Sequence, residues 1–302
     1  MTRLFDHLLT LLPARKDART ALRSGKVAVR GVPTADGGRL VDPAEVSVNP
    51  RAPRITPGRD LAVVFRDDHF AVVYKPAGML AVPAPGRNQE PDVIGVAARI
   101  LGRAMPVHRL DEQTSGLMLV ARTERARAAL IEQLTAHRIE RRYLALVRHQ
   151  FPAKPLRIET MLLRNRGDGL RGSVDAHPAL EARRPPHQRP VVAITHARRV
   201  ELLPRDVSLV ECRLETGRTH QVRIHLAERG FPVLGEPLYA PRRVRLAAPR
   251  LALHSSVLGL EHPATGQALR WDAPLDDTLE ILRRQLLDSG KADDEGTSEK
   301  EG

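Results

Sequence analysis

An aspartate at the mouth of a polar loop, Asp111, is the residue of this sequence best placed to do chemistry. Arg109 precedes it by two positions, turn-forming residues follow at 114–116, and an apolar run at 117–120 predicts a buried strand. A carboxylate in a loop that a buried strand supports is a common position for a nucleophile or a proton carrier. The same residues could also simply cap a turn, so the spacing alone leaves the role of Asp111 open.

A second group of chemistry-bearing residues lies at 216–225, with the sequence TGRTHQVRIH. A strand is expected to end at Gly217 and a helix to begin at Thr219, which places His220 and Arg223 one turn apart on one helix face. Basic residues there could hold a carboxylate in its ionised form, or they could touch phosphates. The residues by themselves leave both interpretations open.

These two blocks resemble the signatures of RluA-type RNA pseudouridine synthases, and further blocks of that family follow the same order along the chain. The resemblance covers roughly residues 63–275. The blocks are KPAGML at 75–80, HRLDEQTSG at 108–116, RYLALV at 142–147, TGRTHQVRIH at 216–225, GFPVLGEPLY at 230–239, LALH at 251–254 and HP at 262–263. Arg141 stands where many members carry lysine, and Glu236 stands where the family has aspartate, which leaves the role of that carboxylate in doubt.

The resemblance implies an enzyme that detaches uracil from ribose, turns it and rejoins it through carbon five. It implies that Asp111 is the catalytic aspartate, that Tyr143 stacks on the target base, and that Arg223 pairs with Asp111. Residues expected to bind the substrate are His108, Arg109, Arg218, His220 and Gln221. No redox step or group donor is needed, so we expect no cofactor, and no His/Cys/Asp spacing indicates a metal site.

The charge of the chain favours a polyanionic partner. Lys and Arg outnumber Asp and Glu by 48 to 36, which gives a formal net charge of +12. Nucleic acid is the commonest partner of so basic a protein. A single cysteine, Cys212, lies in an alternating apolar stretch and is expected to be a small core residue. One cysteine excludes an internal disulfide and a thiolate metal cluster.

Residues 1–50 resemble the S-four-type RNA-binding module that often precedes such synthases. An amphipathic helix is expected over residues 4–12, a second over 17–23, and a hairpin around 27–32. The residues expected to bind RNA are Arg15, Lys16, Arg19, Arg23, Lys26 and Arg30. The alternative is a basic cap that packs on the main domain.

Alternating apolar residues dominate the middle of the chain, and helices are interspersed without regular strand–helix alternation. This pattern favours an α+β fold with a mostly antiparallel mixed sheet flanked by helices and loops, the pseudouridine synthase fold. We expect a linker at 51–60, a catalytic domain at 61–285 and a disordered tail at 286–302. The polar segment 164–190 is expected to form long irregular loops, and its role stays open.

Two functions therefore compete: an RNA pseudouridine synthase, and a non-catalytic RNA-binding or ribosome-assembly protein on the same scaffold. The full set of Asp111, Tyr143 and Arg223 favours the enzyme. The N-terminal module favours ribosomal RNA over transfer RNA as the substrate. No signal peptide or membrane span is evident, so we expect a cytoplasmic protein, and we expect a monomer.

Overall fold

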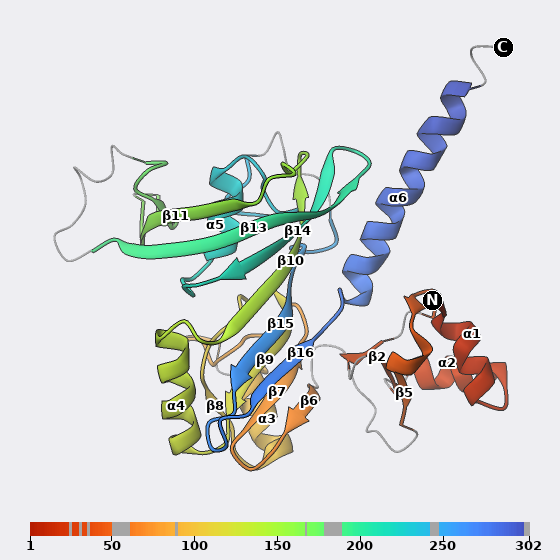
Figure 1. Cartoon of the computed structure of the whole chain (residues 1–302), viewed down its shortest axis with the longest axis horizontal. Coiled ribbons are helices and arrows are strands. Elements are labelled where there is room, and N and C mark those ends of the chain that lie inside the picture. The colour runs from red at the N-terminus through yellow and green to blue at the C-terminus, as the bar shows by residue number, and fades with distance from the viewer. Residues whose placement is uncertain are drawn as a thin grey trace. The chain divides into compact units, whose positions relative to one another are not determined.

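The computed structural model describes residues 1–23, 26–29, 32–34, 37–49, 61–87, 90–166, 168–177, 189–241 and 248–298 (Figure 1). The chain divides into two compact units, and each is described by itself. The first comprises Met1–Ile139 with Ser255–Glu280, and the second comprises Glu140–His254 with Ile281–Gly302. The predicted linker at 51–60 lies outside the described residues.

The N-terminal part of the first unit has a core of its own. Its elements are β1 (Thr2–Arg3), α1 (Leu4–Leu11), α2 (Arg15–Arg23), β2 (Val27–Val29), β3 (Val32–Pro33), β4 (Leu40–Val41), η1 (Pro43–Glu45) and β5 (Val46–Val48). The expected helices and hairpin are present, since α1 ends before Pro13 and β2 pairs antiparallel with β3. Leu4 and Leu8 of α1 are fully buried in this core with Val27.

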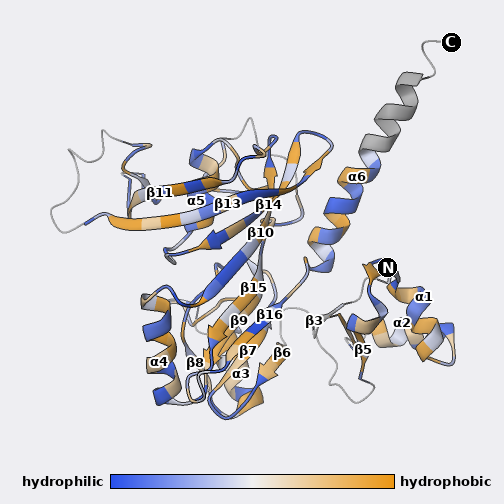
Figure 2. Ribbon diagram, viewed as in Figure 1, coloured by the Kyte–Doolittle hydropathy of each residue, from blue (hydrophilic) through white to orange (hydrophobic). Residues whose placement is uncertain are grey.

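The remainder of the first unit is a sheet with two helices. Its elements are β6 (Ala62–Arg66), β7 (Phe70–Lys75), α3 (Val93–Leu101), β8 (Met105–Pro106), β9 (Ser115–Ala121), α4 (Glu124–Thr135), β15 (Leu253–Glu261), which enters this unit at Ser255, and β16 (Ala268–Asp272). Every residue of β9 is buried, as the continuous apolar run predicts. Strands β6, β7 and β9 are correspondingly hydrophobic (Figure 2).

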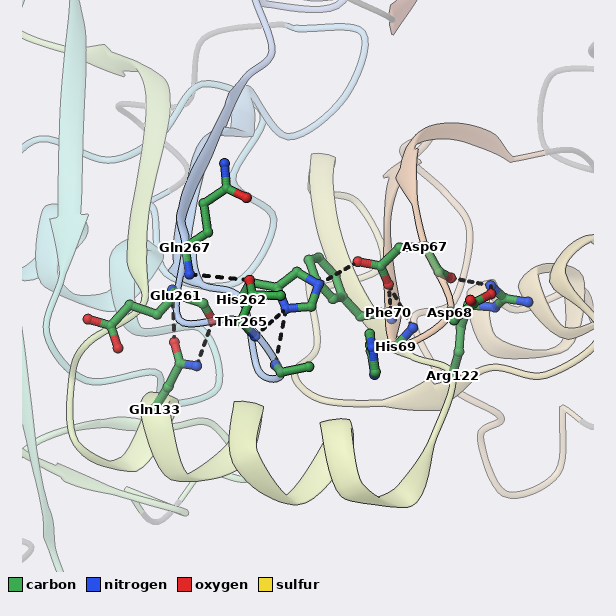
Figure 3. Close-up of polar contacts among 11 residues, drawn as sticks. Asp67, Asp68, His69, Phe70, Arg122, Gln133, Glu261, His262, Thr265 and Gln267 are labelled. Atoms are coloured by element: carbon green, nitrogen blue, oxygen red, sulfur yellow. Dashed lines mark hydrogen bonds and ion pairs between the residues drawn. The ribbon is translucent and has the colours of Figure 1, made fainter.

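A polar network ties three loops of this sheet together (Figure 3). His262 donates from Nε2 to Asp67, at 2.8 Å, because its Nδ1 accepts two backbone N–H groups of the β15–β16 turn. Asp67 also accepts the N–H groups of His69 and Phe70, and Arg122 donates to the carbonyl of Asp67. Burial alone would raise the pKa of Asp67, but these hydrogen bonds lower it. His262 is therefore a structural residue.

The second unit is an antiparallel sheet with α5 on one face. Its strands are β10 (Glu140–Arg148), β11 (Leu156–Leu163), β12 (Gly172–Ser173), β13 (Val191–Leu203) and β14 (Val207–Leu214), in the spatial order β12-β11-β13-β14-β10. Helix α5 (Gln221–Glu228) is buried along most of its length. Side chains alternate on β10, so Arg141, Tyr143 and Ala145 face the interior. Cys212 is fully buried opposite Tyr143, which confirms its expected core position.

The expected α+β class, with a mostly antiparallel sheet flanked by helices, is confirmed. Two features differ from expectation. Strand β11 occupies 156–163, for which no element was expected. Helix α6 (Asp277–Ser298) continues through much of the predicted disordered tail, in a stretch that has no proline and whose first half contains four leucines. Among the described residues, no helix is both long and apolar enough to cross a membrane.

Candidate active site

The loop that carries Asp111 lies in the first unit and is held through its backbone. The N–H of Thr114 donates to the carbonyl of Asp111 at 3.0 Å, which closes a tight turn. The fully buried Lys75 donates from Nζ to the carbonyl oxygens of Glu112 at 2.7 Å and Thr114 at 2.9 Å. It also donates to Pro76 O at 3.0 Å. One ammonium group therefore joins the KPAG turn to the Asp111 loop.

A glycine fixes the end of this loop against β15. Gly116 has φ +112°, and a Cβ added there would lie 2.2 Å from the carbonyl oxygen of Ser255. Both the backbone conformation and the close approach require glycine at this position. The loop therefore meets β9 in a single conformation, which positions Asp111 relative to the sheet.

Glu112, next to Asp111, is paired with the guanidinium of Arg87 by two hydrogen bonds of 2.8 and 3.1 Å. Arg87 lowers the pKa of Glu112, which stays ionised. The carbonyl of Glu112 also accepts the N–H of Gly78, at 2.9 Å. The Glu112 carboxylate therefore supports the loop, and Asp111 lies half-buried beside it.

His108 and Arg109 lie beside Asp111 but differ in exposure. The imidazole Nε2 of His108 accepts the N–H of Leu119 on β9 at 2.9 Å, so this nitrogen cannot also bind a substrate. His108 therefore supports the loop through Nε2, and its expected contact with the substrate stays a prediction. Arg109 is exposed, which suits the expected contact with RNA.

In the second unit, Tyr143 and Arg141 lie two residues apart on the interior face of β10. Tyr143 is buried opposite Cys212, which lies opposite Ala197. Arg141 donates from Nη2 to the carbonyl of Glu215 at 2.9 Å, just before the TGR turn. Burial lowers the pKa of Arg141, and an electrostatic interaction with Tyr143 partly offsets this effect.

The turn at 216–220 is held by side chains. Gln221 accepts at Oε1 from Thr216 Oγ1 at 2.7 Å and from the N–H of Arg218 at 3.0 Å. Its Nε2 donates to Ile194 O at 2.9 Å and to Thr195 Oγ1 at 3.0 Å. A glutamine amide has two donor hydrogens and one acceptor oxygen, and all are occupied by protein groups. Gln221 therefore positions the turn, a role different from the expected contact with substrate.

His225 continues this network into the sheet. Its ring nitrogens lie 2.9 Å from Thr160 Oγ1 and 2.9 Å from Thr195 Oγ1. Burial lowers the pKa of His225 to about 4, so the ring is neutral at pH 7. The polar chain thus runs from β11 through α5 to the turn.

Arg223 forms a buried bidentate pair with Glu236. Arg223 Nε and Nη2 lie 2.7 and 2.8 Å from the two carboxylate oxygens of Glu236. Burial alone would raise the pKa of Glu236, but Arg223 and the N–H groups of Leu238 and Tyr239 lower it. The role left in doubt for Glu236 is therefore clear in the structure: it orients the guanidinium of Arg223.

The expected pairing of Arg223 with Asp111 joins residues of the two units and stays a prediction. Within the second unit, His220 has a left-handed backbone, φ +61°, and its Nδ1 lies 2.7 Å from Tyr239 Oη. The guanidinium of Arg223 lies 5.4 Å from the centre of the Tyr239 ring. Arg218 is exposed and donates from Nε to Val192 O, at 3.1 Å. The structure thus groups His220, Arg223 and Tyr239 in one cluster.

Sequence reasoning missed three residues of this arrangement, namely Lys75, Arg141 and Glu236. The only local signal for each was its place inside a family block. Their partners lie far along the chain: Lys75 and Thr114 are 39 residues apart, and Arg141 and Glu215 are 74 apart.

Comparison with known proteins decides the family. Residues 69–228 match the RNA pseudouridylate synthase family. The chain belongs to this family. An uncharacterized RNA pseudouridine synthase of Chloroflexus aurantiacus is 41% identical over 71% of this chain and 66% of that protein. Ribosomal large subunit pseudouridine synthase D of Zymomonas mobilis is 36% identical over 76% of this chain and 74% of that protein.

The solved structure of human RNA pseudouridylate synthase domain containing 1 has the same fold. Its TM-score is 0.59 at 23% identity, and the match covers 77% of this chain and 97% of that one. The expected RluA-type synthase is confirmed, and the chain is an RNA pseudouridine synthase, an isomerase. The S-four identity of residues 1–50 stays a prediction.

Proposed function

We propose that this synthase isomerises uridines of ribosomal RNA in the cytoplasm, with Asp111 as the catalytic carboxylate and the target base flipped out of its stack. The position of Asp111 in a loop that the buried Lys75 holds through backbone carbonyls, within the matching family block, carries this proposal, because a reacting carboxylate must be held in a fixed place. The name of the Zymomonas mobilis relative supports ribosomal RNA over transfer RNA.

The reaction breaks the bond between C1′ of the ribose and N1 of uracil, and forms a bond between C1′ and C5. An ionised Asp111 can attack the sugar, attack the ring or remove a sugar proton, and the proposal is common to all three routes. A proton must later leave C5, and Tyr143 is the group proposed to stack on the base and take part in that transfer. Flipping the base costs a few kcal/mol, and the exposed Arg109 is proposed to fill the vacated space.

Basic residues of the N-terminal part are proposed to hold the RNA backbone. Arg15, Lys16 and Arg19 are exposed on α2, whereas Arg30 and the side chain of Arg23 lie outside the described residues. Arg15 and Arg19 line a cavity of about 480 Å³ with Phe5. The guanidinium of Arg15 lies over the Phe5 ring, 5.5 Å from its centre, and we propose that it contacts an RNA phosphate from this position. Lys26 is half-buried, so its contribution to RNA binding is proposed to be smaller.

Replacing Asp111 by asparagine tests the catalytic assignment. Asparagine keeps the size of the side chain but cannot act as an anionic nucleophile or base, so we expect kcat to fall by about three orders of magnitude or more. Pseudouridine formed in large-subunit ribosomal RNA would be mapped in vitro, and RNA affinity would be measured in parallel. Affinity is expected to stay close to that of the parent.

The matched control is Asp68→Asn, which removes a carboxylate from an exposed turn of the same unit. This variant is expected to keep full activity. Turnover by Asp111→Asn at the parent rate would overturn the assignment. Conversion of transfer RNA alone by the parent enzyme would overturn the choice of ribosomal RNA.

A further inference from the structure

The guanidinium of Arg141 is buried without an anion among the described residues. The side chain is 6% exposed, its Nη2 donates to the neutral carbonyl of Glu215, and its Nε has no hydrogen-bond partner there. A buried cation without a counter-charge is costly for a folded protein. Such a group commonly marks the place where a ligand supplies the missing charge.

Other arginines of the same unit show how this chain pairs its cations. Arg142, the next residue, faces the opposite side of β10 and contacts the carboxylates of Glu140 at 2.6 Å and Glu211 at 3.2 Å. Arg223 is buried as deeply as Arg141 and has the carboxylate of Glu236. Arg141 differs from both because its described partner is a backbone carbonyl.

A glycine gives access to this guanidinium. Gly217 is exposed, and a Cβ added there would lie 2.5 Å from Nη1 of Arg141. Any other residue would cover the guanidinium with its side chain. Helix α5 begins four residues later, and its N-cap residue, His220, makes no side-chain capping bond. Amides at an uncapped helix start add positive potential near the turn.

We propose, on the basis of the proposed function, that Arg141 beneath Gly217 forms a binding site for a phosphate of the RNA substrate, next to Tyr143. The planar guanidinium matches the two free oxygens of a phosphodiester. The site fixes the backbone of the nucleotide whose base stacks on Tyr143. Arg141 therefore binds and positions the substrate, and takes no part in bond making.

The test is a double-mutant cycle between the full-length protein and its RNA. The probe is hexauridylate, in which each phosphate linkage in turn is replaced by an uncharged methylphosphonate. In the parent protein, neutralising one particular linkage is expected to weaken binding about tenfold. In Arg141→Met, the same replacement is expected to have no further effect, because the partner of that phosphate is gone. The salt dependence of binding should also become shallower, by about 0.7 in the log–log slope.

Two controls separate binding from folding. Arg142→Gln removes a neighbouring charge from the opposite face and should leave the methylphosphonate effect intact. Arg141→Lys keeps the charge and should restore part of the effect. Thermal unfolding of Arg141→Met is expected at or above the parent temperature, because an unpaired buried cation is replaced by an apolar side chain.

Additive effects of Arg141→Met and of every methylphosphonate replacement would overturn the proposal. So would destabilisation of Arg141→Met with unchanged phosphate dependence, which would assign Arg141 to holding the turn through Glu215. Because binding is measured without turnover, these outcomes stay distinct from a failure of Asp111 in catalysis.

Discussion

The two units hold their functional loops by different means. In the first unit, one buried ammonium, that of Lys75, grips backbone carbonyls of the Asp111 loop. In the second, the turn at 216–220 is held by a chain of side chains that includes Gln221 and His225. The carbonyls of this loop depend on one buried cation, and the side chains of Glu112 and His108 add further support. A turn held by side chains spreads its dependence over many residues.

Replacing Lys75 by methionine should therefore have the largest effect of any supporting residue. Three carbonyl oxygens lose a charged donor in a buried place, at roughly 1–3 kcal/mol each. We expect the free energy of unfolding to fall by about 4–6 kcal/mol in all. Activity measured well below the unfolding temperature should also fall strongly in kcat, because Asp111 is no longer fixed.

The matched control for Lys75 is Lys154→Met, at an exposed position. Its unfolding free energy is expected to stay within about 0.5 kcal/mol of the parent. Parent-like activity of the Lys75→Met protein at a temperature where it is folded would show that the hydrogen bonds of Lys75 do not position Asp111.

The Arg223–Glu236 pair provides the next test, in the second unit. Glu236→Gln leaves a buried guanidinium without its counter-charge, and removing one partner of a buried pair costs roughly 3–5 kcal/mol. For Glu236→Gln, which keeps the shape of the side chain, we expect the free energy of unfolding to fall by about 3 kcal/mol. The amide oxygen of glutamine still accepts one hydrogen bond from Arg223. Chemical unfolding measures it. kcat should fall more than KM rises, because Arg223 loses its orientation.

A second ion pair of the chain serves as a matched control for the Arg223–Glu236 pair. Arg283 pairs with Glu201 in the same bidentate geometry, at 2.7 and 2.9 Å, but both side chains are partly exposed. Glu201→Gln is expected to cost no more than about 1 kcal/mol. Equal decreases in the free energy of unfolding for Glu236→Gln and Glu201→Gln would mean that burial does not decide the strength of the Arg223–Glu236 pair.

The difference between the units also explains what could be predicted from the sequence. The local pattern predicted β9, because the apolar run at 117–120 lies within the element that it defines. Asp111 and Arg223 were predicted as site residues because they belong to recognisable blocks, and their roles stay predictions. Gln221 belongs to such a block too, but its positioning role was not predicted, because its partners Ile194 and Thr195 lie 26 or more residues away.

Long-range contacts of this kind leave no periodic signal in the sequence. The interaction of Thr160 with His225 spans 65 residues, and nothing near either residue indicates the other. Glu236 was doubted because it stands where the family has aspartate, and its partner Arg223, on another element, gave no local signal of its role. The family blocks therefore predicted the type of reaction. They did not predict which residues of a block hold the turn through long-range contacts.

The smallest expected effect concerns the pH dependence of the second unit, where side chains hold the turn. Burial lowers the pKa of His225 to about 4 from an unfolded value of 6.5, so the unfolded chain takes up a proton first as the pH falls. The contribution of His225 to stability is complete above pH 6.5 and is lost between pH 6.5 and 4, by roughly 2–3 kcal/mol. Urea unfolding across this range measures the loss, and His225→Asn should flatten that part of the profile. An identical slope in the parent and in His225→Asn would mean that His225 carries no such linkage, and the network would then resemble the backbone grip of the first unit in its response to acid.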